Sequence, residues 1–141
     1  MPGHDAREGF ADTENTPLIR TDFSAEAAWR EVVDAVNRDW EFGFRALVSI
    51  IDDPRFDGWT VEQLVASPHA NRQAILLVAD AKTMTHAERL VLCVDLIGSG
   101  KPFRVILPQL WSVENNLSLA NMDYEEFAGA TDGDGVFRGF V

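Results

Sequence analysis

A chain of 141 residues, 46% of them hydrophobic, is long enough to form one globular domain with its own core and too apolar to be disordered. Twelve basic and twenty-three acidic side chains give a formal net charge of −11, which repels phosphate backbones and anionic lipid surfaces. The charge therefore argues against nucleic acid and membranes as partners and favours a basic protein or a cation.

The chain has no recognisable targeting segment and a single cysteine. No apolar run approaches the roughly 20 residues of a membrane-spanning helix, and the first residues lack the apolar core of a signal peptide. We therefore expect a cytoplasmic protein. Cys93 lies in an apolar run, so we expect it to be buried, and it has no second cysteine for an internal disulfide.

The amino-terminal third predicts a parallel β-α-β unit. Residues 1–16 are polar and aperiodic and are expected to be a flexible tail, which leaves residues 17–141 as a single α/β domain. A short strand at 17–22 leads into an amphipathic helix, for which Ser24 is the expected N-cap. A second strand at 44–51 follows, and strand, helix and strand in this order predict a right-handed crossover.

The middle of the chain predicts the rest of the sheet. Thr60 and Gln63 fit a capping box that begins a short helix. Apolar runs at 74–79 and 90–97 predict two strands, and the ten or so residues between them favour an antiparallel return. A glycine-containing turn then leads into a strand at 103–107, which completes a β-hairpin. The sequence thus predicts an α/β fold with a mixed five-stranded sheet and covering helices in two or three layers.

Residues 108–128 form the most unusual stretch of the chain. Its apolar residues predict one buried helix face, and Asp123 followed by Glu126 predicts the capped start of a second helix. Trp111 is expected to be a core anchor whose indole N–H bonds to a carbonyl oxygen. Beyond this stretch, Phe137 and Phe140 are expected to dock on the body of the domain.

Three asparagines in this stretch allow two interpretations. Asparagine is a poor helix former, so their amides either pin loop and strand-end backbone groups or present a polar recognition surface. We favour the structural role, because buried polar groups are almost always paired. The three residues are Asn115, Asn116 and Asn121.

Five segments together resemble a bacterial domain family whose function is not established. They are residues 18–23, 56–58, 60–63, 78–80 and, most specifically, 110–127. The resemblance extends over nearly the whole chain after the tail, with Tyr124 standing where the family is expected to have phenylalanine. It implies no activity, cofactor or partner, so function has to be argued from the residues.

Acidic residues at strand ends suggest a metal site as an alternative. Asp22, Asp52 and Asp80 each follow an apolar strand, and parallel strands would bring them to one edge of the sheet, where α/β folds bind ligands. Oxygen ligands suit Mg²⁺, so the alternative function is a Mg²⁺-dependent phosphoryl-transfer or hydrolase-type enzyme. The competing explanation is that Asp commonly follows strands because it forms turns and helix caps.

We see no complete catalytic set, so our leading prediction is a non-enzymatic acidic binding module without a cofactor. Such a module would neutralise or regulate a basic protein, as antitoxins and immunity proteins do. Exposed carboxylates would steer the partner and an aromatic residue would anchor it. The predicted binding residues are Glu114, Asp123, Tyr124, Glu125 and Glu126. A third possibility is a homo-oligomer in which residues 110–127 pack against their own copy.

Overall fold

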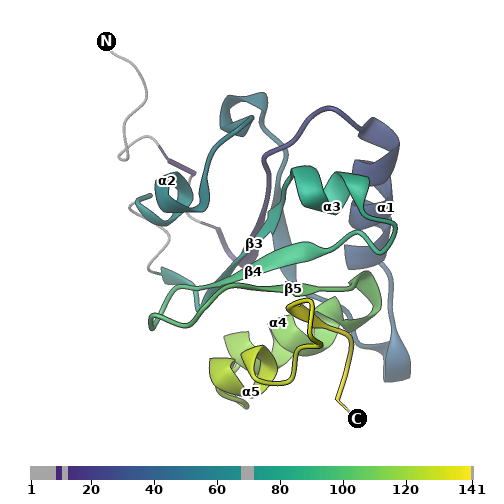
Figure 1. The fold of residues 1–141 in the computed structure, drawn as a ribbon, viewed down its shortest axis with the longest axis vertical. Helices are drawn as coiled ribbons and strands as arrows, with labels where there is room; N and C mark the ends of the chain where they lie inside the picture. Colours follow the sequence, from purple (N-terminus) through teal and green to yellow (C-terminus); the bar gives the residue numbers. More distant parts are fainter. Residues whose placement is uncertain (1–8, 11–12, 68–71, 141) are drawn as a thin grey trace.

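A computed structural model describes residues 9–10, 13–67 and 72–140. In this part of the chain, six strands form one mixed sheet in the order β2-β1-β3-β4-β5-β6 (Figure 1). The strands are β1 (Thr16–Arg20), β2 (Val48–Ile51), β3 (Ile75–Ala79), β4 (Val91–Asp95), β5 (Phe103–Val105) and β6 (Val136–Phe137). The predicted α/β class and mixed sheet are confirmed, with one strand more than expected.

The strand directions follow the predicted topology. β1 pairs in parallel with both β2 and β3, whereas β4 is antiparallel to both of its neighbours, β3 and β5. The β-α-β start, the antiparallel return and the hairpin are therefore confirmed. The additional strand, β6, is only two residues long and pairs in parallel with β5. Two residues are too few to show the alternating pattern by which a strand is recognised in a sequence.

Four of the five α-helices in the described residues lie where the sequence predicts them. The five are α1 (Glu26–Val36), α2 (Val61–Val65), α3 (Ala81–Thr85), α4 (Leu110–Ser118) and α5 (Tyr124–Ala128), with short 3₁₀ turns η2 (Glu41–Gly43), η3 (Pro54–Phe56) and η5 (Leu107–Gln109). The capping box of Thr60 and Gln63 is present. Ser24 is not the N-cap of α1: that position is Ala25, and the Ser24 hydroxyl donates to Asp22 at 2.6 Å. Helix α3 was not predicted.

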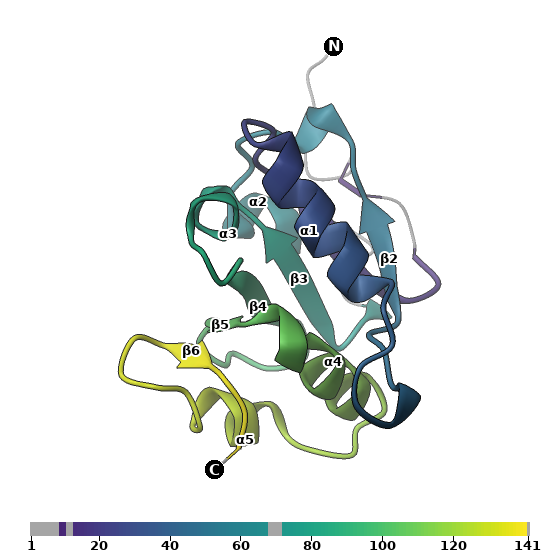
Figure 2. The same ribbon diagram turned by 90° about the vertical axis from the view of Figure 1, so that its right-hand side faces the viewer.

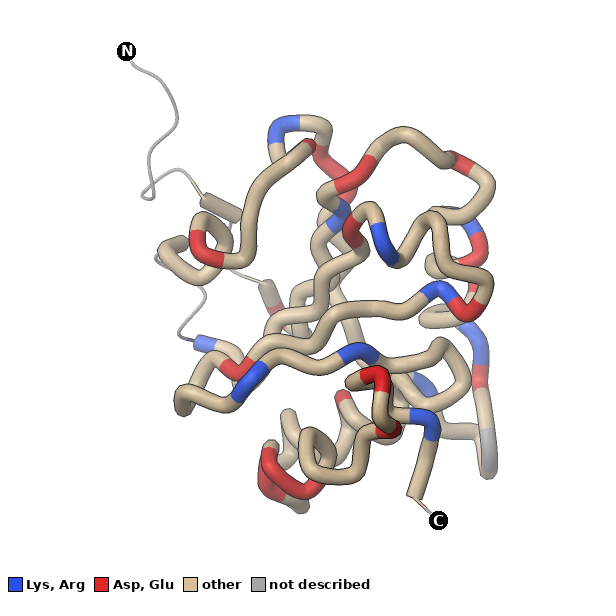
Figure 3. The backbone as a smooth tube through the Cα atoms, viewed as in Figure 1, with Lys and Arg blue, Asp and Glu red and all other residues tan. Residues whose placement is uncertain are grey.

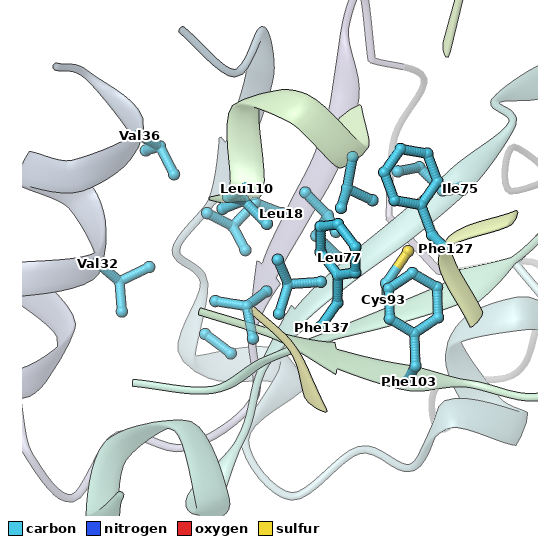
Figure 4. Packing of buried hydrophobic residues seen from close by; sticks show 14 of the residues in the cluster. Leu18, Val32, Val36, Ile75, Leu77, Cys93, Phe103, Leu110, Phe127 and Phe137 are labelled. Carbon is cyan, nitrogen blue, oxygen red and sulfur yellow. The ribbon is translucent and has the colours of Figure 1, made fainter. Parts of the chain in front are cut away.

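Helices cover the sheet on both faces, so the fold has three layers (Figures 1 and 2). Leu18 and Leu77 face the larger buried cluster, to which α1, α4 and α5 contribute. Figure 4 shows side chains of α1, such as Val32, directed towards this cluster, with Phe103 and Phe127 at its other end. Alternate residues of the same strands face a second cluster that α2 covers. Cys93 is buried in the larger cluster, as predicted.

Both ends of the described chain contact the body. Phe137 is buried in β6, and Phe140 packs on it with ring centroids 5.0 Å apart, so the expected docking of these rings is confirmed. Phe10 is buried in the second cluster, and Thr16 already belongs to β1. The predicted flexible tail is therefore wrong for these residues. Its residues 1–8 and 11–12 lie outside the described part of the chain.

Candidate interaction site

The carboxyl ends of β1, β2 and β3 lie at one edge of the sheet, as the metal hypothesis requires, but their carboxylates have protein partners. Asp52 accepts hydrogen bonds from Arg20 Nη1 at 3.3 Å and from Trp29 Nε1 at 3.1 Å. Arg20 is buried, and its guanidinium lies 4.3 Å from the centre of the Phe23 ring. The sequence analysis missed this arginine, although a charged residue at the end of an apolar strand is itself a signal, because such a side chain needs a partner.

Asp80 is engaged in a different pair. Its carboxylate accepts two hydrogen bonds from Arg104, at 2.7 and 2.9 Å, and caps α3 through the Thr83 N–H at 3.2 Å. Burial alone would raise the pKa of Asp80, but the hydrogen bonds and charge of Arg104 outweigh it, so the pKa lies below its usual value. Asp22 instead accepts from Ser24. Within the described residues, no group of three or more His, Cys, Asp or Glu side chains could hold a metal ion.

Glu114, one of the predicted binding residues, is buried in α4 rather than exposed. Only 1% of its surface is accessible. Its carboxyl oxygens accept hydrogen bonds from the Leu47 N–H at 2.7 Å, the Thr16 hydroxyl at 2.9 Å and the Asn115 amide at 2.9 Å. The side chain therefore ties α4 to β1 and to the segment that precedes β2. Glu114 does not belong to an acidic surface that a partner could contact.

The first two asparagines of the stretch have the structural role that we favoured. The Asn115 amide donates to the Arg45 carbonyl oxygen at 3.0 Å, beside the bond from Glu114 to Leu47. The Asn116 side-chain amide donates to the Ser112 carbonyl at 2.9 Å, and the Asn116 backbone carbonyl accepts from the Asn121 N–H. The side chain of Asn121 is exposed.

Trp111 does not have the predicted hydrogen bond. Its Nε1 is buried without a hydrogen-bond partner among the described residues. The ring instead stacks on Phe44, with centroids 5.3 Å apart and planes inclined by 7°. Trp111 therefore supports an aromatic residue that is itself half exposed, and it is only partly a core residue.

The other four predicted binding residues lie together at the start of α5. Asp123, Glu125 and Glu126 are exposed, and none of them forms an ion pair with a described Lys or Arg side chain. Figure 3 shows acidic residues in red at the bottom of the view, in the part of the chain that forms α5. Glu126 also caps the helix, since its carboxylate accepts from the Asp123 N–H at 2.7 Å.

Tyr124 lies at the boundary between this acidic stretch and the core. Its ring packs edge-on against Phe103, and its hydroxyl is 2.9 Å from the Lys101 carbonyl oxygen and 3.2 Å from that of Cys93. Burial raises the pKa of the Tyr124 hydroxyl above its usual value, so it remains a neutral donor at physiological pH. The residue is thus held in place by the sheet, and only part of its ring faces solvent.

A cleft of about 270 Å³ adjoins α5 at the junction with α4. Leu117, Met122 and Tyr124 line its apolar part, and Asp95 and Asp123 line its polar part. Asp95 is partly satisfied within the hairpin turn, where its carboxylate accepts from three backbone N–H groups. The arrangement suits an apolar side chain from a segment that also carries positive charge.

A larger cleft of about 400 Å³ lies between the end of α1, the loop before β4 and η5. Its charged side chains largely pair with one another or with neighbours: Arg89 bonds to Glu31 at 3.0 Å, and Glu88 bonds to Arg138 at 2.8 Å. Cys93 is fully buried, and its burial raises the pKa of the thiol and so disfavours the nucleophilic thiolate.

These features define a mixed α/β domain in which buried polar side chains fix surface loops while one acidic helix remains open to solvent. The chain belongs to the family described as Domain of unknown function (DUF6924), whose profile matches residues 15–140. The resemblance to a family without an assigned function is thereby confirmed. A comparison with proteins of curated function finds no match. No helix among the described residues has the length and apolar character needed to cross a membrane.

Proposed function

We propose that this domain is a non-enzymatic binding module that neutralises or regulates a basic protein, and that α5 with its adjoining cleft is the contact surface. The observation that carries the proposal is the set of three carboxylates at the start of α5, which are exposed and have no cation among the described residues. Several other exposed acidic groups have an arginine partner, as Asp39 has in Arg45.

The chemistry of the surface specifies a basic segment with at least one apolar side chain. Unpaired carboxylates on a body with a net charge of −11 accelerate the approach of a cationic protein about tenfold or more at low salt. The apolar part of the cleft, between Leu117 and Tyr124, then supplies the short-range contact that charge alone does not give. At physiological ionic strength, salt screens the electrostatic attraction at distances beyond about 8 Å. It leaves the apolar contact in the cleft largely unchanged.

A capture experiment with two charge-matched variants tests the proposal. In the α5 amide variant, each acidic group of the α5 surface is replaced by its amide: Asp123→Asn, Glu125→Gln and Glu126→Gln. The control amide variant makes the same change at three exposed positions outside α5 and its cleft: Asp34→Asn, Asp57→Asn and Glu62→Gln. Amides preserve side-chain shape and the helix cap, so the two variants differ only in where the charge is removed.

We expect the immobilised domain to retain a basic protein from cell extract at low salt and to release it at high salt. The control amide variant should retain the same protein, and the α5 amide variant should not. Retention by the α5 amide variant, or the lack of any salt-sensitive basic partner, would remove the support for the proposal. Calorimetric titration with Mg²⁺ tests the enzymatic alternative: binding that is lost in Asp80→Asn would revive it.

A further inference from the structure

The cleft beside α5 combines an apolar wall with two carboxylates. Leu117, Met122 and Tyr124 form the apolar wall, and Asp95 and Asp123 supply the carboxylates. The volume of about 270 Å³ lies below the range of roughly 300–1,000 Å³ that is usual for small-molecule sites. The cleft therefore suits one inserted side chain better than a separate ligand, and that side chain has to be apolar over part of its length and cationic elsewhere.

The turn between β4 and β5 holds the Asp95 carboxylate in place. Its Oδ1 accepts hydrogen bonds from the N–H groups of Ile97 and Gly98, and its Oδ2 accepts from the Gly100 N–H, each at 3.0 Å. A Cβ at Gly100 would lie only 2.5 Å from the Tyr124 ring and 2.9 Å from Asp95 Oδ2. The glycine thus allows the ring and the carboxylate to share one corner of the cleft. Both groups are fixed before a partner arrives, which lowers the entropic cost of binding.

The hydrogen bonds of Asp95 decide which cation the cleft can accept. A carboxylate has about four lone-pair positions, and the turn uses three of those of Asp95. The remaining position, on Oδ2, can accept one further N–H. An ammonium group needs only one acceptor from each carboxylate, whereas the guanidinium fork of arginine is matched to two oxygens side by side. The arrangement therefore favours lysine over arginine.

Neither carboxylate of the cleft forms an ion pair with a described Lys or Arg side chain. Asp123 is exposed, so it can supply the second acceptor for an ammonium group. Lys101 comes from the turn that carries Asp95, and its backbone carbonyl accepts from the Tyr124 hydroxyl. Its side chain is exposed and does not pair with a described carboxylate. The nearest lysine in the chain therefore does not occupy the position that the cleft offers.

We propose that the cleft binds one lysine side chain of the basic partner, with the methylene groups against the apolar wall and the ammonium group at Asp95 and Asp123. The inference rests on the proposed function of α5 and adds to it which side chain the surface recognises. Lysine carries an apolar stem and a cationic head, so a single side chain meets both demands of the cleft. The stem supplies a short-range contact that salt does not screen, and the head supplies the charge.

Two peptides of equal charge and different stem length test the contact with the apolar wall. Hexaornithine lacks one methylene group per side chain relative to hexalysine. At low salt and neutral pH, hexalysine should bind the full chain about fourfold more tightly, since burial of one methylene group contributes about that factor. Fluorescence anisotropy of the labelled peptides measures both affinities. A third peptide, hexaarginine, tests the preference for an ammonium group and should bind no more tightly than hexalysine.

Met122 allows the bound peptide to be located. In the full chain labelled with ¹³C at its methionine methyl groups, the Met122 resonance should shift when hexalysine is added, and that of Met84, which is buried in the larger cluster, should not. Met122→Ser shortens the apolar wall without a change of charge, so it should bring the affinities for hexalysine and hexaornithine together. The matched control is Phe42→Ser, which removes a side chain that is 92% exposed between α1 and β2 and should keep the fourfold difference.

The inference and the proposed function can fail separately. Equal, salt-sensitive binding of hexalysine and hexaornithine to wild type would overturn the inference and leave the proposed function standing, because the α5 carboxylates would then act through charge alone. A Met122 resonance that does not move, or the lack of any binding of hexalysine, would also overturn it. Tighter binding of hexaarginine would assign the cleft to arginine instead. If the peptides behave as expected but no basic protein is captured from extract, the cleft recognises lysine and the proposed function loses its support.

Discussion

The acidic side chains of this domain fall into two groups with opposite environments. Glu114 and Asp80 are directed inwards, and their carboxyl oxygens meet backbone N–H groups, a hydroxyl or an arginine. Asp123 and Glu125, in contrast, project from α5 into solvent without a cation among the described residues. The number of acidic residues therefore overstates the number of carboxylates that a partner can contact, because each inward carboxyl group is already engaged.

The two groups should respond differently to the same substitution. Removing an inward carboxyl group leaves buried donors without acceptors and lowers stability, whereas removing an outward one changes the surface field and leaves the fold intact. Substitutions at the two kinds of position therefore test whether the division drawn from the structure is real.

The largest effect is expected at Glu114. Glu114→Ala should lower the free energy of unfolding by about 3 kcal/mol, because a buried donor left without its acceptor costs about 1–3 kcal/mol and this change leaves the Leu47 N–H and the Thr16 hydroxyl in that state. Urea unfolding measures it. Glu125→Ala is the outward counterpart and should change the unfolding free energy by less than about 0.5 kcal/mol. Equal losses in the two variants would contradict the division.

The next largest effect is expected at Asp80. Asp80→Asn should lower the free energy of unfolding at neutral pH by about 2 kcal/mol, because it removes a two-bond ion pair with Arg104 whose partners are mostly buried. The measurement is urea unfolding at a series of pH values, since this pair also gives stability a particular dependence on acid.

The sign of that dependence follows from the pKa of Asp80, which is lower in the folded state than its ordinary value. The contribution of Asp80 to stability is fully present above the unfolded-state pKa of about 3.9 and is lost as the pH falls through the folded-state pKa. Wild type should therefore lose more stability on acidification than Asp80→Asn. Identical slopes on the acid side would show that Arg104 does not stabilise the charged form.

Position along a helix would have identified Glu114 as an inward residue from the sequence. It is four residues after Leu110 and one after Val113, both of which are buried, so it lies on the apolar stripe of α4. Its chemical type suggested an exposed acid, and its spacing suggested burial; the spacing was the better guide. A polar residue on an apolar stripe is a candidate for a buried hydrogen-bond network.

Other contacts could not be read from the sequence, because they depend on how distant segments meet. The sequence placed Asp52 and Asp80 correctly at strand ends, but it did not reveal that Arg20 comes from the neighbouring strand or that β5 brings Arg104 across from the hairpin. The short elements α3 and β6 were missed for a related reason. A few residues carry too little periodicity, and tertiary contacts decide their conformation.

A smaller effect is expected at Tyr124, which lies between the two groups. Tyr124→Phe should lower the free energy of unfolding by about 1 kcal/mol, since it removes only the hydroxyl that approaches the Lys101 and Cys93 carbonyl oxygens. The ring keeps its contact with Phe103, so partner binding at α5 should persist. Thermal unfolding measures the first effect, and the capture experiment measures the second. If Tyr124→Phe no longer captured the partner but kept the stability of wild type, the Tyr124 hydroxyl would have to contact the partner directly.

The smallest effect on stability is expected for the α5 amide variant. This variant replaces the carboxylates of Asp123, Glu125 and Glu126 by neutral amides. The change relieves repulsion between neighbouring carboxylates, but it also removes their favourable interaction with the positive end of the helix dipole. The two contributions have similar sizes and opposite signs, so the free energy of unfolding should stay within about 0.5 kcal/mol of wild type. Urea unfolding of this variant beside the control amide variant decides the point. If only the α5 variant loses stability, its carboxylates belong with the inward group, and a simultaneous loss of partner capture would reflect a damaged helix. If both variants are as stable as wild type and only the α5 variant loses the partner, the loss reports the outward charges themselves.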